Sequence, residues 1–195
     1  INFESLIATK AKRLRYSAGK RKLADFGLRR AQGFAALFAS RAASIGGIDS
    51  TSNVYSAFVY DLIPSGTQAH SWIQSYGDEI TAFRKFAELY PDNCVYLVDT
   101  YDTLKSGIPN AITVGKEMEQ KGYKLSAIRL DSGDLAYLSK KARNMLDQAG
   151  LNYVKIVASN QLDEYLIKSL IEQGAPFDSF GVGTNLITGQ KDAAL

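Results

Sequence analysis

The sequence contains very few of the residues that form disulfides and metal clusters. It has one cysteine, Cys94, and one histidine, His70, among 195 residues. A single cysteine excludes an internal disulfide bond, which is typical of a reducing compartment, so we expect a cytoplasmic protein. A single histidine excludes a metal site built on several histidines and gives no support for a Ser–His–Asp triad. No set of metal ligands stands out in the sequence.

Long apolar runs are absent as well. No segment approaches the roughly 18 consecutive apolar residues of a membrane-spanning helix, and the amino-terminal residues do not form a signal-peptide pattern. We therefore expect no membrane partner. The first residue, Ile1, is not methionine, and residues 193–195 form no clear final element, so we expect a piece of a longer protein.

The charge balance gives little sign of a nucleic-acid partner. The net charge is +3, and 46% of the residues are hydrophobic, which is typical of a soluble globular protein with a substantial core. Nine basic side chains do gather within residues 10–30. Such a run usually forms a solvated helix face. As a binding site it would favour phosphate over a polynucleotide, because no aromatic-rich binding motif accompanies it.

Four short apolar segments each lead into residues of the kind that bind ligands. Residues 94–98, 125–130, 153–158 and 177–180 are followed by Asp99-Thr100-Tyr101-Asp102, Asp131-Ser132-Gly133-Asp134, Ser159-Asn160 and Gly181-Val182-Gly183-Thr184. A helical segment follows the first three, which predicts parallel strands whose carboxyl ends share one edge. Acids there suit sugar hydroxyls or a metal, and glycine amides suit phosphate. We therefore predict a sugar-phosphate site at this edge.

The remaining pattern also predicts an α/β fold with a parallel sheet. Helices are expected at residues 1–15, 31–43, 54–60, 69–76, 79–88, 111–121, 135–148 and 162–172, with further strands at 22–25 and 62–63. Asp131 or Ser132 is expected to cap the helix that begins at Leu135. A closed or nearly closed barrel is favoured over an open doubly wound sheet.

Some of these motifs have both a structural and a functional interpretation. Arg129 lies one residue inside the end of an apolar strand, where it needs a partner and could pair with a ligand carboxylate. His70 follows a glycine loop at the start of a helix, where it is either a structural histidine or faces the same sheet edge. The glycines Gly181 and Gly183 form either a tight turn or a phosphate cradle.

Six motifs, taken in order, resemble those of the nicotinate phosphoribosyltransferase family. They are Asp25-Phe26-Gly27-Leu28-Arg29-Arg30-Ala31, Gly46-Gly47 with Thr51-Ser52-Asn53, Ser65-Gly66-Thr67-Gln68-Ala69-His70-Ser71, Val98-Asp99-Thr100-Tyr101-Asp102, Ile128-Arg129-Leu130-Asp131-Ser132-Gly133-Asp134 and Phe180-Gly181-Val182-Gly183-Thr184. The resemblance implies the irregular TIM-like (β/α) barrel of type II phosphoribosyltransferases over residues 21–195, after a helix and loop over residues 1–20. Family members carry a second domain formed by both chain ends, which we expect this chain to lack, and they act as homodimers.

The resemblance also implies a reaction. Family members condense nicotinate with phosphoribosyl pyrophosphate to give nicotinate mononucleotide and pyrophosphate, the first step of NAD biosynthesis from nicotinate. They use Mg²⁺ and couple the transfer to ATP hydrolysis through a phosphorylated histidine, so such a transferase is also a ligase and a phosphoprotein.

Carried over by position, four residues form the expected base site. Phe26 is expected to stack on the pyridine ring, while Arg29 and Arg129 hold the base and its carboxylate. Ser52 stands where the related nicotinamide-using enzymes carry an aspartate. An aspartate can accept a hydrogen bond from an amide but would repel a carboxylate, so Ser52 favours nicotinate.

The other carried-over residues concern the phosphates and the ribose. His70 matches the histidine that ATP phosphorylates, and Asp99 is expected beside it to orient the ring. Asp131 is expected to bind ribose hydroxyls, and Gly183 and Thr184 the 5′-phosphate. The expected substrate contacts are completed by Thr67 and Asn160.

Two other functions stay open at this point. The first is a nicotinamide phosphoribosyltransferase, which Ser52 disfavours. The second, for this chain taken alone, is a non-catalytic fragment that binds nucleotide or dimerises. A polynucleotide-binding module that relies on the early basic run has the least support.

Overall fold

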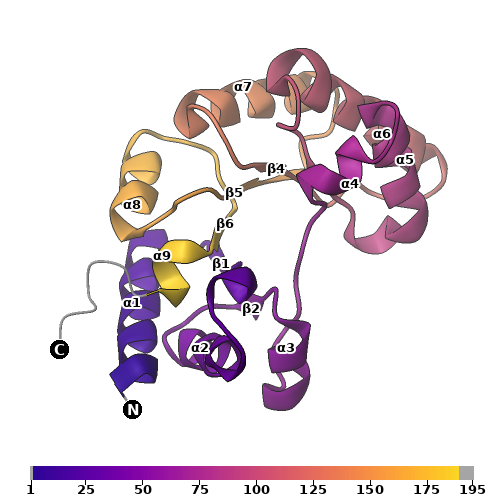
Figure 1. The fold of residues 1–195 in the computed structure, drawn as a ribbon. Coiled ribbons are helices and arrows are strands. Elements are labelled where there is room, and N and C mark those ends of the chain that lie inside the picture. Colours follow the sequence, from indigo (N-terminus) through magenta and orange to yellow (C-terminus); the bar gives the residue numbers. More distant parts are fainter. Residues whose placement is uncertain (1, 189–195) are drawn as a thin grey trace. The chain divides into compact units, whose positions relative to one another are not determined.

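The computed structural model describes residues 2–188, along which helices and strands alternate (Figure 1). The elements are α1 (Asn2–Ala18), β1 (Lys22–Asp25), η1 (Leu28–Arg30), α2 (Phe34–Ile45), β2 (Ser50–Thr51), α3 (Val54–Tyr60), α4 (His70–Gln74), α5 (Glu79–Leu89), η2 (Pro91–Asn93), β3 (Val95–Leu97), η3 (Thr103–Gly107), α6 (Ile108–Gln120), β4 (Ala127–Leu130), α7 (Leu135–Gln148), β5 (Lys155–Ala158), α8 (Glu164–Glu172), β6 (Ser179–Val182) and α9 (Thr184–Ile187). Ile1 and residues 189–195, which the predicted ranges included, lie outside the described part.

The chain divides into two compact units, and neither is continuous in sequence. The first comprises the residues up to Gly66, Ser159–Gln173 and the described residues from Asp178 onward. The second comprises Thr67–Ala158 and Gly174–Phe177. The strands within each unit pair in parallel, which confirms the predicted α/β fold.

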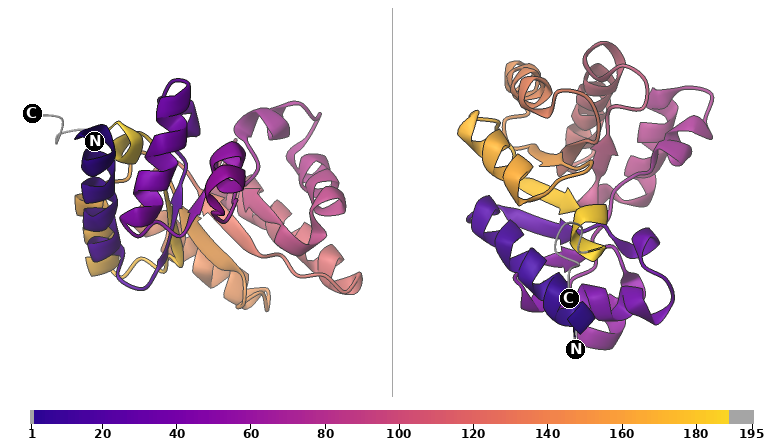
Figure 2. Two further views of the ribbon diagram at one scale, coloured as in Figure 1. Left: turned by 90° about the horizontal axis from the view of Figure 1, so that it is seen from below. Right: turned by 60° about the vertical axis from the view of Figure 1, so that its left-hand side comes forward.

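The first unit contains three parallel strands in the order β2-β1-β6. Strand β1 pairs on one side with β2, through Ala24 and Ser50, and on the other with β6, through Asp25 and Val182. Because side chains alternate along a strand, β1 buries Leu23 and Asp25 on the same side. Helix α1 packs against both α2 and α8 (Figure 2).

The second unit contains three parallel strands in the order β5-β4-β3. Residue Ala127 of β4 pairs with Val95 of β3 and with Lys155 of β5. Helices α5 and α6 pack side by side (Figure 1). The core includes Phe83 of α5 stacked on Tyr96 of β3, with ring centroids 4.4 Å apart. This packing fixes the strands whose ends carry the candidate residues.

Two details of the predicted strands are wrong. Residues 62–63 form no strand, and the only pairing nearby is an isolated bridge between Pro64 and Thr51. The bridge consists of two hydrogen bonds, from the Thr51 N–H to the Ile63 carbonyl and from the Ser65 N–H to the Thr51 carbonyl, both at 2.9 Å. Strand β6 runs to Val182, because the register with β1 continues to Asp25. Gly181 and Val182 therefore lie inside the strand, and not in the loop that the sequence predicted.

The start of α7 and the approach to α6 also differ from the prediction. Asp134 caps α7, because its Oδ1 accepts a hydrogen bond from the Tyr137 N–H at 3.0 Å. Asp131 and Ser132, the predicted caps, lie farther from the helix and contact Asp99 instead. The unpredicted η3 is a π-helical turn.

Among residues 2–188, no helix combines the length and the apolar character needed to cross a membrane.

Candidate functional site

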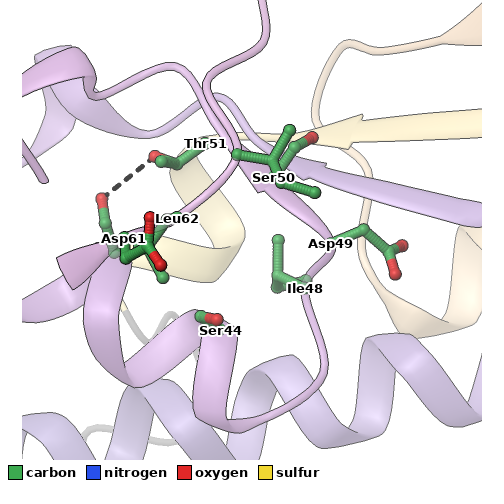
Figure 3. Close-up of a pocket in the computed structure, with 9 residues that line it drawn as sticks. Ser44, Ile48, Asp49, Ser50, Thr51, Asp61 and Leu62 are labelled. Atoms are coloured by element: carbon green, nitrogen blue, oxygen red, sulfur yellow. Dashed lines mark hydrogen bonds between the residues drawn. The ribbon is translucent and has the colours of Figure 1, made fainter. Parts of the chain in front are cut away.

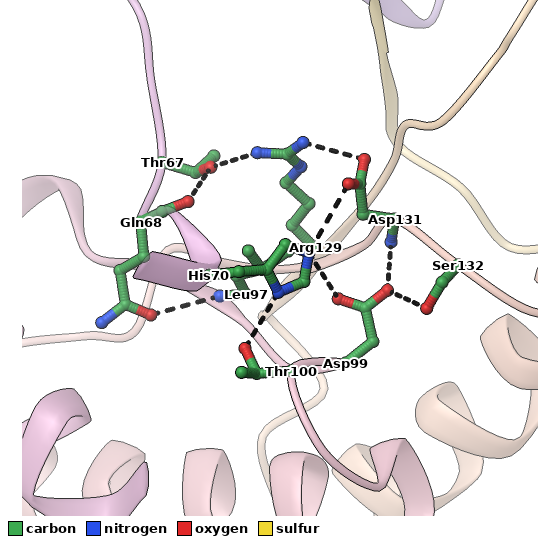
Figure 4. Close-up of polar contacts among 9 residues, drawn as sticks. All are labelled: Thr67, Gln68, His70, Leu97, Asp99, Thr100, Arg129, Asp131 and Ser132. Atoms are coloured by element: carbon green, nitrogen blue, oxygen red, sulfur yellow. Dashed lines mark hydrogen bonds and ion pairs between the residues drawn. The ribbon is translucent and has the colours of Figure 1, made fainter. Parts of the chain in front are cut away.

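His70 is the first residue of α4, and its ring is held between groups from two loops (Figure 4). The Nδ1 atom lies 3.0 Å from Thr100 Oγ1. The Nε2 atom faces two carboxylates, at 3.6 Å from Asp131 Oδ2 and 3.9 Å from Asp99 Oδ1. The side chain is 40% exposed, so a ligand can reach it. The hydroxyl of Thr100, which the sequence did not single out, is thus the hydrogen-bond partner of the ring.

Asp99 connects the loop after β3 to the loop after β4. Its side chain is 1% exposed. Its Oδ2 accepts hydrogen bonds from the Asp131 N–H at 2.7 Å and from the Ser132 hydroxyl at 2.6 Å. Its Oδ1 is buried without a hydrogen-bond partner among the described residues and is the oxygen that faces His70. Asp99 therefore both shapes the second loop and leaves an acceptor beside the ring.

Arg129 lies within β4 and meets groups from two different segments. Its Nη1 donates to Thr67 Oγ1 at 2.8 Å, and its Nη2 donates to Asp131 Oδ1 at 2.8 Å. Its side chain is 16% exposed. The partner that a strand-end arginine needs is therefore Asp131, together with the Thr67 hydroxyl. A guanidinium in this setting can also meet a ligand carboxylate or phosphate.

Gln68 is a buried residue of this region that sequence reasoning missed. It is 2% exposed, and its Oε1 accepts a hydrogen bond from the Leu97 N–H of β3 at 3.2 Å. The contact attaches the segment that carries Thr67 and His70 to the edge of a strand. The only sequence signal was its place within the motif, because neither its burial nor its distant partner is visible locally.

We call Thr67, His70, Asp99, Thr100, Arg129, Asp131 and Ser132 the His70 cluster. All belong to the second unit and come from the ends of β3 and β4 and the segment before α4. The cluster offers hydroxyls and a guanidinium for phosphate and an imidazole nitrogen as nucleophile or proton carrier. No group of three side chains suited to hold a metal ion occurs within residues 2–188. The Asp131 carboxylate is the more accessible of the cluster's two, at 24% exposure, and fits Mg²⁺, which binds through one or two carboxylates together with substrate phosphates.

Phe26 belongs to the first unit and directly follows β1. Its backbone N–H donates to the Val182 carbonyl of β6 at 2.9 Å. Its ring packs over Gly181, where an added Cβ atom would lie 2.3 Å from the ring. Gly181 therefore makes room for an aromatic ring, a different role from the phosphate cradle that the sequence suggested.

The other predicted residues of the first unit lie in the segments that follow strands β1, β2, β5 and β6. Ser52 follows β2, is partly exposed and donates its backbone N–H to the Asp25 carbonyl at 2.8 Å. Arg29 is exposed in η1. Gly183 immediately precedes α9, and Thr184 is the first residue of that helix. Asn160 is exposed after β5 and adopts a left-handed conformation, with φ of 81°.

The carboxylate of Asp25 is the main feature of this unit that the sequence did not reveal. It is fully buried and accepts hydrogen bonds from the Gly27 N–H and from the hydroxyls of Ser40 and Thr51, at 2.7, 2.7 and 2.8 Å. The only sign of this role in the sequence is the position of Asp25 at the end of a short predicted strand. Its partners on α2 and β2 are apparent only in the folded unit.

A small pocket in the first unit is lined in part by Ser40 and Thr51, the two residues whose hydroxyls donate to Asp25 (Figure 3). Its volume is about 210 Å³, and its lining includes the hydroxyls of Ser40, Ser44, Ser50 and Thr51. Pockets that hold drug-sized ligands have volumes of roughly 300–1,000 Å³, so this one is small for a nucleotide. None of the predicted site residues lines it.

Comparison with known proteins gives a consistent result. The model of the nicotinate phosphoribosyltransferase (NAPRTase) family matches residues 21–193. Nicotinate phosphoribosyltransferase of Bacillus subtilis (strain 168) is 53% identical over 196 residues, which cover 100% of this chain and 40% of that relative. The Dictyostelium discoideum protein of the same name is 41% identical over 242 residues, covering 100% of this chain and 41% of that relative. The chain thus spans about two fifths of the length of these curated relatives.

Solved structures agree with the sequence relatives. Human nicotinic acid phosphoribosyltransferase matches with a TM-score of 0.86 and 30% identity, over 93% of this chain and 47% of that chain. The nicotinate-nucleotide pyrophosphorylase from Pyrococcus furiosus matches with a TM-score of 0.83 and 31% identity, over 95% of this chain and 47% of that chain. The chain therefore belongs to the nicotinate phosphoribosyltransferase family.

Proposed function

We propose that the protein to which this chain belongs is a nicotinate phosphoribosyltransferase. It transfers the phosphoribosyl group of phosphoribosyl pyrophosphate to nicotinate and releases pyrophosphate. The observation that carries the proposal is the His70 cluster, which joins an imidazole, two carboxylates, a guanidinium and hydroxyls at the carboxyl ends of parallel strands. Family membership supports the same reaction.

The chemistry requires positioning and charge stabilisation more than proton transfer. As pyrophosphate leaves, the ribose gains oxocarbenium character and the pyridine nitrogen attacks the anomeric carbon. That nitrogen already has a lone pair, so no general base is needed. Orientation of two reactants supplies roughly 7–11 kcal/mol in favourable systems. In the first unit, Phe26 and Ser52 would orient the base. In the second unit, the Arg129 guanidinium is suited to a ligand carboxylate.

The ribose and the phosphates would be held by other groups. In the second unit, Asp131 and Thr67 have oxygens suited to ribose hydroxyls. In the first unit, the backbone around Gly183 and Thr184 is suited to a phosphate. Mg²⁺, when bound, would neutralise charge on the pyrophosphate, and Asp131 is the residue that would hold it.

Coupling to ATP would use His70 as the phosphoryl acceptor. When Nδ1–H donates to the Thr100 hydroxyl, the Nε2 atom keeps its lone pair. That nitrogen can attack the terminal phosphorus of ATP, so that ADP leaves and water later releases phosphate. The irregular TIM-like barrel, a homodimer and a cytoplasmic location belong to the same proposal. The parallel pairing within each unit and the likeness to the human structure support the barrel.

Thermal unfolding of this chain with nicotinate mononucleotide tests the proposal, with nicotinamide mononucleotide as the matched control. A ligand at about 100 times its Kd adds about 2.7 kcal/mol, and 1 kcal/mol raises Tm by about 2–4 °C at this size. We expect a rise of about 5–10 °C with the nicotinate form only. Equal rises with both nucleotides would contradict the nicotinate preference. A cooperative melt that neither nucleotide shifts would contradict the site.

A further inference from the structure

The Asp25 carboxylate is buried, accepts three hydrogen bonds and has no assigned role. Its Oδ1 accepts from the Gly27 N–H, which lies in the segment of Phe26. Its Oδ2 accepts from the hydroxyls of Thr51 and Ser40. Burying a carboxylate is costly unless it is well hydrogen-bonded, so a fold that keeps one at zero exposure depends on the contacts it makes.

The same residue also contacts the segment of Ser52 through its main chain. The Asp25 carbonyl accepts the Ser52 N–H at 2.8 Å. Thr51, which donates its hydroxyl to the Asp25 side chain, accepts the Asn53 N–H on that same hydroxyl at 3.0 Å. The backbone on both sides of Ser52 is therefore tied to Asp25, directly or through Thr51.

Phe26 has little freedom to move independently of this arrangement. Its ring occupies the space left by the missing side chain of Gly181. An added Cβ atom at Gly27 would lie 1.8 Å from the Ile187 side chain, so the residue after Phe26 is also closely packed. Packing against Gly181 fixes the position of the Phe26 ring. The hydrogen bond from the Gly27 N–H to Asp25 fixes the backbone turn that follows Phe26.

We propose that Asp25 is a positioning residue that fixes Phe26 and Ser52 relative to each other, and that it thereby sets the affinity for the pyridine base. The inference rests on the proposed function, in which these two residues contact nicotinate. Asp25 itself is buried and need not touch the ligand. Its effect is therefore expected on the base and not on the sugar phosphate.

Three substitutions separate this role from general stability. Asp25→Asn keeps the shape, but its amide nitrogen cannot accept the hydrogen bonds that Thr51 and Ser40 donate. Thr51→Val keeps the volume and removes both the hydrogen bond to Asp25 and the acceptor for Asn53. Ser40→Ala is the control, because it also removes one hydroxyl from Asp25 but lies on α2, and its own contact with the Ser52 segment is a single long one, 3.3 Å between the hydroxyls of Thr51 and Ser40.

The experiment measures binding of nicotinate mononucleotide and of ribose 5-phosphate, which lacks the base, to the parent chain and to each variant. Cooperative melts confirm that each variant is folded. We expect Asp25→Asn and Thr51→Val to weaken nicotinate mononucleotide at least tenfold and ribose 5-phosphate less than twofold. Ser40→Ala should change either affinity by less than threefold. Equal losses for both ligands, or no loss for the nucleotide, would overturn the positioning role.

Amide hydrogen exchange at Gly27 and Asn53 provides a readout that needs no ligand. If Asp25 connects the two segments, Asp25→Asn should speed exchange at both amides, while Ser40→Ala should affect neither. Unchanged exchange at both in Asp25→Asn would overturn the connection. If the unsubstituted chain binds neither ligand, the proposed function and the role of Asp25 in selectivity are both refuted. The exchange rates would then still show whether Asp25 holds the two segments together.

Discussion

The His70 ring shows how single contacts prepare a side chain for chemistry. One ring nitrogen has a hydroxyl partner and the other faces carboxylate oxygens. In the full-length protein, His70→Ala should abolish stimulation of turnover by ATP and leave a slow ATP-independent reaction. Initial rates with and without ATP test this expectation. Undiminished stimulation in the variant would exclude His70 as the phosphoryl acceptor.

Ser52 gives a prediction about the choice of base. An aspartate here would repel the carboxylate of nicotinate and accept a hydrogen bond from the amide of nicotinamide. Ser52→Asp should therefore shift the ratio of affinities for the two mononucleotides towards nicotinamide by tenfold or more. Ser50→Asp, two residues earlier, is the control. If the ratio does not change in Ser52→Asp, charge at this position does not decide specificity.

Cys94 gives a prediction about reactivity and pH. The thiol is fully buried, and burial raises its pKa from 9.0 to about 11. Thiolate is the reactive form, so the folded chain should resist a maleimide at pH 8 and react only after unfolding. Between pH 9 and 11 the unfolded thiol ionises while the folded one stays protonated. Stability should therefore fall, by on the order of 2 kcal/mol at pH 11, relative to Cys94→Ala.

At the scale of elements, Asp134 is responsible for starting α7. Its side chain accepts the Tyr137 N–H, an orphan donor of the first helical turn. Asp134→Ala should lower the free energy of unfolding by about 1 kcal/mol, and Asp134→Asn by much less. Urea denaturation measures both. Equal losses in the two variants would mean that the cap is not the cause.

Much of the element pattern could be predicted from the sequence, because helix and strand periodicity is local. Helix α7 and strand β1 occur at their predicted bounds. The errors arose where tertiary contacts decide. The extension of β6 to Val182 depends on its pairing with β1, and the π-helical turn ends at Gly107, where an added Cβ would lie 1.7 Å from the Val98 carbonyl.

The candidate site was likewise predicted only in part from the sequence. The motifs identified His70, Asp99, Arg129 and Asp131, and the structure brings these four together. Their supporting residues were missed. Gln68 and Asp25 are buried, and these two and Thr100 have partners far away in sequence, which a local motif does not encode.

At the scale of the whole molecule, α2 and α3 leave large apolar side chains exposed. Phe34 is 72% exposed on α2, and Phe58 is 85% exposed on α3. Exposed apolar surface favours association. We expect sedimentation velocity to show concentration-dependent association that Phe58→Ser reduces. Tyr16→Ser, which changes an exposed aromatic residue on α1, is the control. A monomer at all concentrations would contradict the expectation.

The pairing of β1 with β6 has a consequence for synthesis on the ribosome. Strand β1 (Lys22–Asp25) is translated well before its neighbour β6 (Ser179–Val182). Nearly all of the second unit is complete by then, whereas β1 still has one bare edge. Strand pairings between segments far apart in sequence form slowly, and a strand edge that stays unpaired can pair with another chain. The nascent chain should therefore depend most on chaperones while β1 is made and β6 is not.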